Sequence, residues 1–167
     1  VVLSTAENDE RGIISTCMHS QGEFAEELMI KGPATRVWVD ELLEMDNYGE
    51  PDWRPYMNGN FVFKHAVTRM PEAIQEVLDD AGKTPDDIDL LIPHQANLRI
   101  SAMVQRHFKL PDEKVFNNIQ HCGNTTAGSI PIAMTEALEK GKLNRGDVLC
   151  LTAFGSGFTW GAALLEF

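Results

Sequence analysis

The chain has 167 residues, 43% of them hydrophobic and 23% charged, and a formal net charge of −11 at pH 7. This length suits one domain with a substantial core, because a chain of about 150 residues buries roughly 70% of its unfolded surface. The negative charge argues against nucleic acid as a partner, and no apolar run approaches the ~18 residues of a membrane span. The three cysteines form no CxxC pair and no disulfide framework, which favours a reducing, cytoplasmic setting.

The first third of the chain predicts strands followed by loop. Residues 1–6 and 12–18 are rich in apolar and β-branched side chains, and the polar residues 7–10 favour a turn that pairs them. Because a strand stands at the start with no lead-in, we expect the chain to begin inside a larger fold. Glycines and prolines interrupt residues 20–57, so we expect mostly loop there, with one short helix near residues 37–44.

A long helix is predicted after Asn58, a good N-cap, because apolar residues then recur at helical spacing until Gly82. Pro71 should kink or divide this helix, since proline lacks the amide N–H and clashes with the preceding turn. The rest alternates strands at 88–92, 115–117, 148–154 and 159–167 with helices at 97–108 and 126–140. That alternation, ending in a hairpin, predicts an α/β fold with a mixed sheet covered by helices.

Two short polar segments interrupt apolar surroundings: residues 93–97 (PHQAN) after a predicted strand, and residues 122–126 (CGNTT) before a predicted helix. They supply an imidazole, His94, and a carboxamide, Asn124, which are N–H donors suited to a developing oxyanion. In a third segment, residues 154–161, small side chains let backbone N–H groups approach a ligand. No Cys or Ser in a recognisable activating context accompanies them, so the predicted reaction centre lacks a nucleophile.

A basic stretch follows the first polar segment. Residues 90–111 hold no Asp or Glu but carry Arg99, Arg106 and Lys109. Such a face beside His94 could dock an anionic partner, although the chain as a whole is acidic. The alternative interpretation is a helix face that simply contacts solvent.

Three strings together resemble the C-terminal half of β-ketoacyl-[acyl carrier protein] synthase III, a condensing enzyme of the thiolase fold. They are LIPHQANLRI at 91–100, GNTTAGSIP at 123–131 and AFGSGFTWG at 153–161. The spacing of 30 residues between His94 and Asn124 also fits that family. The resemblance runs from about residue 1 to 167. It implies one half of a layered αβαβα fold, with the half that carries the nucleophilic cysteine absent from this chain.

The resemblance implies a decarboxylative Claisen condensation that starts fatty acid synthesis. An acyl group passes from acyl-CoA to the cysteine, malonyl-acyl carrier protein loses CO₂, and the resulting enolate attacks the acyl-cysteine. Of the family's Cys-His-Asn triad, only the catalytic His94 and Asn124 are present, so the isolated chain is expected to be inactive. Because decarboxylation needs no base, two uncharged N–H donors aimed at the enolate oxygen suffice.

The same resemblance assigns further residues. A loop that offers a backbone N–H to the acyl oxyanion corresponds to Gly155, Ser156 and Gly157, where Ser156 replaces a common glycine. The pantetheine tunnel corresponds to Gly59, Phe63, Ala96 and Asn97, and docking of the acidic carrier protein to Lys64, Arg99 and Arg106. CoA and carrier-protein thioesters are the implied substrates, with no cofactor beyond them, no metal, no membrane association, and a homodimer in the complete protein.

Other interpretations stay open. Taken singly, His94 could be a turn histidine, Asn124 a turn or cap residue, and Phe63 a core residue of its helix. Cys122 is interpreted as structural and the other two cysteines as core thiols, and the histidines show no metal-ligand spacing. The chain could be a non-catalytic binding module, because the nucleophile is absent. It could also belong to a related condensing enzyme of polyketide, quinolone or ketone synthesis.

Overall fold

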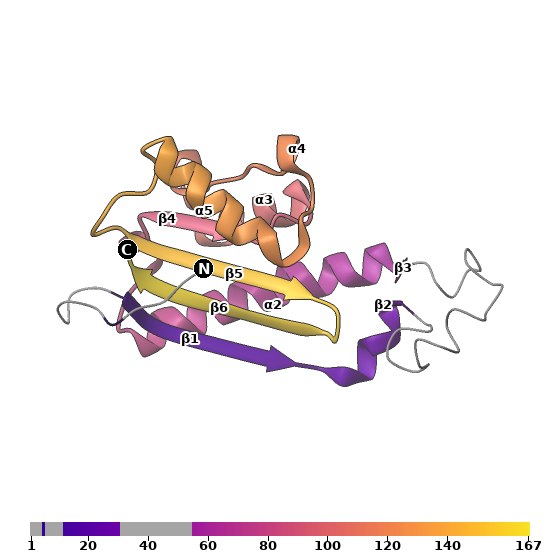
Figure 1. The fold of residues 1–167 in the computed structure, drawn as a ribbon. Helices are drawn as coiled ribbons and strands as arrows, with labels where there is room; N and C mark the ends of the chain where they lie inside the picture. The colour runs from indigo at the N-terminus through magenta and orange to yellow at the C-terminus, as the bar shows by residue number, and fades with distance from the viewer. Residues whose placement is uncertain (1–4, 6–11, 31–54) are drawn as a thin grey trace.

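In the computed structural model, the described residues are 5, 12–30 and 55–167. Within them a four-stranded sheet has the order β1-β6-β5-β4 (Figure 1). Its strands are β1 (Gly12–Ser20), β4 (Leu90–Pro93), β5 (Val148–Gly155) and β6 (Thr159–Glu166). β4 and β5 run parallel, whereas β6 runs antiparallel to β5 and to β1. The mixed sheet predicted from the sequence is confirmed.

Helices cover both faces of this sheet (Figure 1). α2 (Gly59–Asp80) and α3 (Leu98–Phe108) pack on one face, and α5 (Ser129–Glu139) packs on the other. The first face buries a cluster that joins both helices to the strands, including Ile74, Val104, Leu91 and Cys150. The second cluster is smaller and sets alanines of α5 against β4 and β5: Ala133, Ala137, Leu90, Ile92 and Leu149. Each large buried side chain contributes about 1.5–3 kcal/mol to the free energy of unfolding. The two clusters therefore hold β4 in place from both faces of the sheet.

α2 begins as predicted after Asn58, whose side-chain oxygen accepts a hydrogen bond from the Phe61 N–H. The helix then continues through Pro71 without a break, so the predicted division there is wrong. A proline inside a helix lowers the stability of that helix by about 3 kcal/mol. The buried side chains of Met70 and Ile74 on either side contribute a comparable amount and hold the helix on the sheet.

Short elements complete the described chain. They are η1 (Gly22–Glu27), β2 (Leu28–Ile30), β3 (Pro55–Met57), η4 (Pro85–Asp87), η5 (Asp112–Lys114), α4 (Ile119–Cys122) and η6 (Thr126–Gly128). β2 and β3 pair antiparallel as a second, two-stranded sheet. The prediction of mostly loop over residues 20–57 therefore missed structure at both described ends. Strands of three residues are too short to show an alternating pattern.

Three other element predictions have different outcomes. Residues 115–117 form only one bridge, between Leu91 and Val115, rather than a strand. The helix predicted from residue 126 begins as the η6 turn, because Thr126 has a left-handed φ of 52° that an α-helix cannot include. The strand predicted at residues 1–6 and the helix predicted at 37–44 lie outside the described residues.

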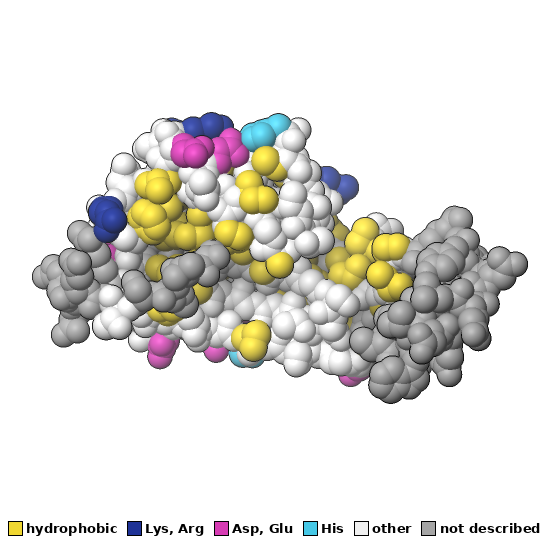
Figure 2. All heavy atoms as spheres, viewed as in Figure 1, with side chains coloured by type: hydrophobic (Ala, Val, Ile, Leu, Met, Phe, Trp, Pro, Cys, Tyr) yellow, Lys and Arg dark blue, Asp and Glu magenta, His cyan; other side chains and the backbone are white. Residues whose placement is uncertain are grey.

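Within the described residues, the α5 face of the sheet is covered less completely than the α2 face. Ile132 and Leu138 on α5 are 41% and 49% exposed, and Met18 on β1 is 81% exposed. Figure 2, seen from the α5 side, shows hydrophobic side chains gathered over α5 and the strands beneath it. In the described part of the chain, no helix combines the length and the apolar character needed to cross a membrane.

Candidate active site

A cavity of about 760 Å³ lies where β4 and β5 end, between α2 and the start of α5. Its walls combine the loop after β4, the loop before α5 and the turn between β5 and β6. Polar side chains in its lining gather at these loops: His94, Asn97, Asn124, Thr126, Ser129, Ser156 and Thr159. A large, mostly apolar cavity with a few convergent polar groups is the usual form of a ligand site.

His94 is placed by the end of β4. Its backbone N–H donates to the carbonyl of Thr152 on β5 at 2.7 Å, which continues the pairing of the two parallel strands by one residue. The side chain is half-buried, and burial lowers the pKa of the imidazole from its ordinary value because the charged form loses hydration. Burial therefore favours the neutral form of His94.

Ser129 holds the imidazole of His94 through a hydrogen bond. The Ser129 Oγ lies 2.6 Å from His94 Nδ1 and also accepts a hydrogen bond from the Gln95 N–H at 3.3 Å. A hydroxyl can donate one hydrogen bond and accept two, so Ser129 can accept from Gln95 and also donate its own proton to Nδ1 of a neutral ring. In that arrangement the proton of the neutral ring is on Nε2. Among the described residues Nε2 has no partner, so it is free to donate to a ligand.

Asn124 offers a second donor to the same cavity. Its Oδ1 accepts a hydrogen bond from the Thr126 N–H at 2.9 Å. A backbone N–H can only donate, so the atom facing it is the oxygen, and the amide nitrogen Nδ2 is left to donate elsewhere. The left-handed backbone of Thr126 costs about 1–3 kcal/mol, and strain of this kind concentrates at functional sites.

The turn between β5 and β6 closes one end of the cavity. Gly155 and Ser156 line it, whereas Gly157 is outside the lining. The Ser156 hydroxyl donates to the Leu28 carbonyl at 2.6 Å and so ties the turn to β2. Gly157 has φ of 137°, and a Cβ there would come within 2.9 Å of the Thr159 nitrogen. Only glycine fits that position.

The four residues predicted to line a pantetheine tunnel, Gly59, Phe63, Ala96 and Asn97, all line this cavity. Asn97 also caps α3, since its Oδ1 accepts from the Arg99 N–H at 2.9 Å, and its amide nitrogen remains available. Phe63 packs against the α2–α3 cluster as well, so its predicted core role and its place in the lining coexist.

A second hollow of about 500 Å³ adjoins the cavity through Phe63 and contains Arg99 and Arg106 in its lining. The Arg99 guanidinium lies 5.1 Å from the centre of the Phe63 ring. Both arginines are exposed on α3. Lys64 is exposed on α2 beside Phe63 but is not part of this lining. The structure thus brings two of the three predicted docking residues to one groove.

The cysteines differ from one another. Cys150 is buried, as predicted for a core thiol, and burial raises its pKa to about 12. Cys17 is half-buried at the edge of the core rather than inside it, and its Sγ lies 3.4 Å from the Ala73 carbonyl. Cys122 is half-buried at the end of α4 and is not among the residues that line the cavity.

Sequence reasoning missed two residues that position the site, Ser129 and Gln95. The buried Gln95 donates through Nε2 to the Pro93 carbonyl at 2.7 Å, and its Oε1 accepts from the N–H groups of Asn118 and Ile119 at 3.0 and 3.2 Å. It therefore links the loop after β4 to the segment that leads to Asn124. The sequence signal that could have identified them is that both are polar residues within stretches of small or apolar residues.

Comparison with known proteins identifies the family. The model of the 3-oxoacyl-[acyl-carrier-protein (ACP)] synthase III C-terminal part matches residues 78–167, more than half of the chain. The beta-ketoacyl-[acyl-carrier-protein] synthases III of Aquifex aeolicus and Roseiflexus sp. are 42% and 41% identical over 166 and 167 residues, each covering 99% of this chain. These matches cover 48% and 49% of the two relatives, so the chain spans about half the length of the curated relatives it matches.

A solved structure supports the same assignment. The beta-ketoacyl-[acyl carrier protein] synthase III of Thermus thermophilus has a TM-score of 0.83 at 39% identity, covering 96% of this chain and 47% of that one. The fold predicted from the sequence, the C-terminal half of a layered thiolase-like fold, is confirmed. The chain belongs to the 3-oxoacyl-[acyl-carrier-protein] synthase III family, also called the β-ketoacyl synthase III family.

Proposed function

We propose that this chain is the C-terminal part of a β-ketoacyl-[acyl carrier protein] synthase III that condenses acyl-CoA with malonyl-acyl carrier protein at the start of fatty acid synthesis. One observation carries the proposal. Two uncharged donors, His94 Nε2 and Asn124 Nδ2, are left without partners among the described residues and belong to one apolar cavity. Such donors suit an oxygen on which negative charge develops.

In the proposed reaction the malonyl thioester loses CO₂, and the electron pair of the broken C–C bond moves onto the thioester oxygen as an enolate. His94 and Asn124 donate hydrogen bonds to that oxygen. The enolate carbon then forms a new C–C bond to the carbonyl of an acyl-cysteine, whose thiolate leaves. That cysteine is proposed to lie in the N-terminal half of the complete protein. The backbone of the loop at Gly155, Ser156 and Gly157 is proposed to hold the oxyanion of the acyl-cysteine.

The substrates are proposed to be thioesters of phosphopantetheine, carried on CoA or on acyl carrier protein, with no cofactor beyond them. The pantetheine arm would run along Gly59, Phe63 and Ala96, where the Asn97 amide nitrogen can donate to its carbonyl groups. No described residue of this cavity is acidic, which suits a phosphorylated arm.

The acidic carrier protein is proposed to dock over Arg99 and Arg106, with Lys64 at the margin. Both arginines share a groove that joins the cavity through Phe63, so a docked carrier could direct its arm inward. The acid-free stretch 90–111 gives this face the complementary charge. We propose that the complete protein is a homodimer that works in the cytoplasm.

The test is the reaction itself, carried out with the complete polypeptide and separately with residues 1–167. The complete protein should convert acyl-CoA and malonyl-acyl carrier protein to β-ketoacyl-carrier protein, releasing one CO₂ for each product. Residues 1–167 should do neither, and intact-mass measurement should find no stable acyl group on them. Absence of product from the complete protein, or stable acylation of Cys122 in the short chain, would contradict the proposal.

A further inference from the structure

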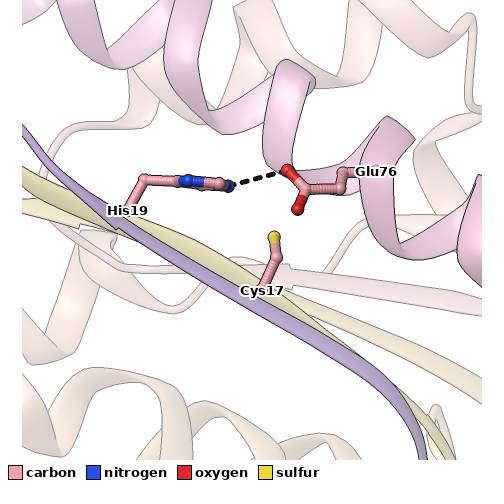
Figure 3. A group of neighbouring side chains, drawn as sticks. All are labelled: Cys17, His19 and Glu76. Carbon is pink, nitrogen blue, oxygen red and sulfur yellow. Dashed lines mark hydrogen bonds and ion pairs between the residues drawn. The ribbon is translucent and has the colours of Figure 1, made fainter.

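A second group of reactive side chains lies away from the cavity, on the face where β1 meets α2. Cys17 and His19 are two residues apart on β1, so both point to the same face of the sheet, toward α2. Glu76 on α2 points back at them, and Figure 3 shows the three side chains converging. None of the three lines the cavity.

The three potential ligand atoms are close enough to share one ion. His19 Nε2 lies 2.7 Å from Glu76 Oε2, and all three atoms, with Cys17 Sγ, lie within 4.8 Å of one another (Figure 3). Tetrahedral Zn²⁺ has bonds of about 2.0–2.3 Å, which places its ligand atoms roughly 3.3–3.8 Å apart. The His19–Glu76 contact must therefore open by about 0.6–0.8 Å to admit an ion between its atoms. The side chains are 41% and 51% exposed, so they have room to do this.

Neighbouring groups hold the ligands in place. The His19 ring stacks on Trp160 of β6, with centroids 5.6 Å apart and 30° between the planes. Trp160 is in turn covered by the Arg69 guanidinium at 5.1 Å. The Cys17 thiol sits against the Ala73 carbonyl, one helical turn from Glu76. Two ligands thus come from a paired strand and the third from a packed helix, which is a more rigid base than loops.

A comparison within the molecule separates this group from a look-alike. His121, Cys122 and Glu136 also lie within 4.8 Å of one another. There, however, Glu136 forms an ion pair with Lys140 and accepts from Asn118, and these bonds lower the pKa of its carboxyl to about 2. A metal ion would have to displace that lysine. Among the described residues Glu76 has no such cation, and its only hydrogen bond is to His19.

We propose that Cys17, His19 and Glu76 bind a divalent cation of the borderline class, Zn²⁺ foremost, with water completing the coordination. Thiolate, imidazole and carboxylate are the ligand types that Zn²⁺ takes, and three protein ligands leave one position open. On binding, the Cys17 thiol releases one proton to solvent and His19 binds as the neutral ring. The ion ties the edge strand β1 to α2 and stabilises the fold.

The direction of the pH effect follows from the thiol. A cysteine thiol must lose its proton to ligate a metal ion, so at neutral pH the metal must displace a proton from Cys17. Affinity for Zn²⁺ should therefore rise as pH rises through the neutral range. Binding to the folded protein alone should also raise its unfolding temperature in proportion to the logarithm of free Zn²⁺ above the Kd.

The test uses the metal-free complete protein titrated with Co²⁺, which reports a bound thiolate by a sulfur-to-cobalt charge-transfer band, and with Zn²⁺ by calorimetry. One equivalent of Co²⁺ should produce the band, and Zn²⁺ should remove it. Cys17→Ser should abolish the band. Glu76→Gln should fold normally, because Glu76 is exposed. It should weaken Zn²⁺ binding by at least roughly 10–100-fold, which is the loss seen when a residue that only supports a metal ligand is removed.

Cys122→Ser is the matched control, because it removes a cysteine from the look-alike group. Its titration should equal that of the parent protein. The proposal is overturned if no thiolate band forms, if the band survives Cys17→Ser, or if Glu76→Gln binds Zn²⁺ as tightly as the parent. A band lost with Cys122→Ser alone would place the ion at the other group and would also contradict it.

Discussion

The cavity has two unlike sides, one made by strand ends and one by α2. On the strand-end side each donor is held by a neighbour: His94 by Ser129, and Asn124 by Thr126. On the α2 side, residues such as Val62, Ala66 and Met70 contribute apolar surface without a hydrogen bond to the site. The first side can place charge-stabilising groups accurately, whereas the second sets shape and excludes water. Changes on the first should therefore reduce the rate of the chemical step, and changes on the second should reduce binding.

The largest expected effect is that of Asn124→Asp in the complete protein. This variant keeps an oxygen for the Thr126 N–H but replaces the free N–H donor with a carboxylate oxygen facing the enolate. Loss of one such donor costs about 100–1,000-fold, and the added negative charge should make the loss at least that large. The measurement is the rate of CO₂ release from malonyl thioester.

Phe63→Ala is the matching change on the α2 side. It should raise KM roughly 10–100-fold with little change in kcat, because it removes apolar contact that substrate and transition state share. If Phe63→Ala reduced kcat as much as Asn124→Asp does, the two sides of the cavity would not differ in the way described.

A smaller loss is expected from Arg99→Glu, on the groove outside the cavity. Use of malonyl-carrier protein should fall roughly 10-fold, while use of malonyl-CoA should change little, because only the carrier presents an acidic surface. Exposed charges are screened beyond about 8–10 Å at physiological salt, so the loss should shrink as salt is added. Equal losses with both substrates would place Arg99 in the tunnel or in the fold.

Ser129→Ala tests how the strand-end side is held. Removing the hydroxyl should lower the rate of decarboxylation roughly 5–10-fold. This is the effect of losing one hydrogen bond that contributes about 1 kcal/mol or slightly more. Nitrogen NMR of His94 supplies the readout that a purely structural role would not change. The parent should show the proton on Nε2, and the variant should show a mixture of the two tautomers. A variant with unchanged tautomer would contradict the role assigned to Ser129.

The smallest expected effect is on stability. Because burial lowers the pKa of His94, the unfolded chain binds a proton that the native protein does not, between the native value and the ordinary value of about 6.5. The free energy of unfolding should fall as pH drops through that interval and level off below it. Urea midpoints measured against pH should show this contribution in the parent and lose it in His94→Gln. Identical pH dependence in the two proteins would contradict the neutral, buried state of His94.

Sequence periodicity predicted the frame of the molecule but not the contacts between distant segments. α2, β4, α3, β5 and β6 lie close to their expected positions because each is long or strongly patterned. The short strands β2 and β3 carried no pattern, and the tie between Ser156 and Leu28 spans 128 residues. The division predicted at Pro71 is wrong because local propensity ignores the packing on either side of it.

The site shows the same division. His94 and Asn124 were found because polar residues at strand and helix ends stand out from apolar surroundings, and both do line one cavity. Spacing along the chain could not reveal the group of Cys17, His19 and Glu76, because Glu76 lies 57 residues after His19. Ligand sets assembled across a strand and a helix become visible only when the strand register and the helix face are known.

The central claim is that His94 serves the enolate and not the acyl transfer that precedes it. The direct measurement follows both half-reactions in one sample of the complete His94→Ala protein, using the rate of cysteine acylation by acyl-CoA and then the rate of CO₂ release from malonyl-carrier protein. The account predicts that CO₂ release falls about 100-fold or more while acylation changes far less, because the enolate forms only in the second step. If acylation fell first and decarboxylation survived, His94 would activate the nucleophile instead, and the assignment of its Nε2 proton to the enolate oxygen would be wrong.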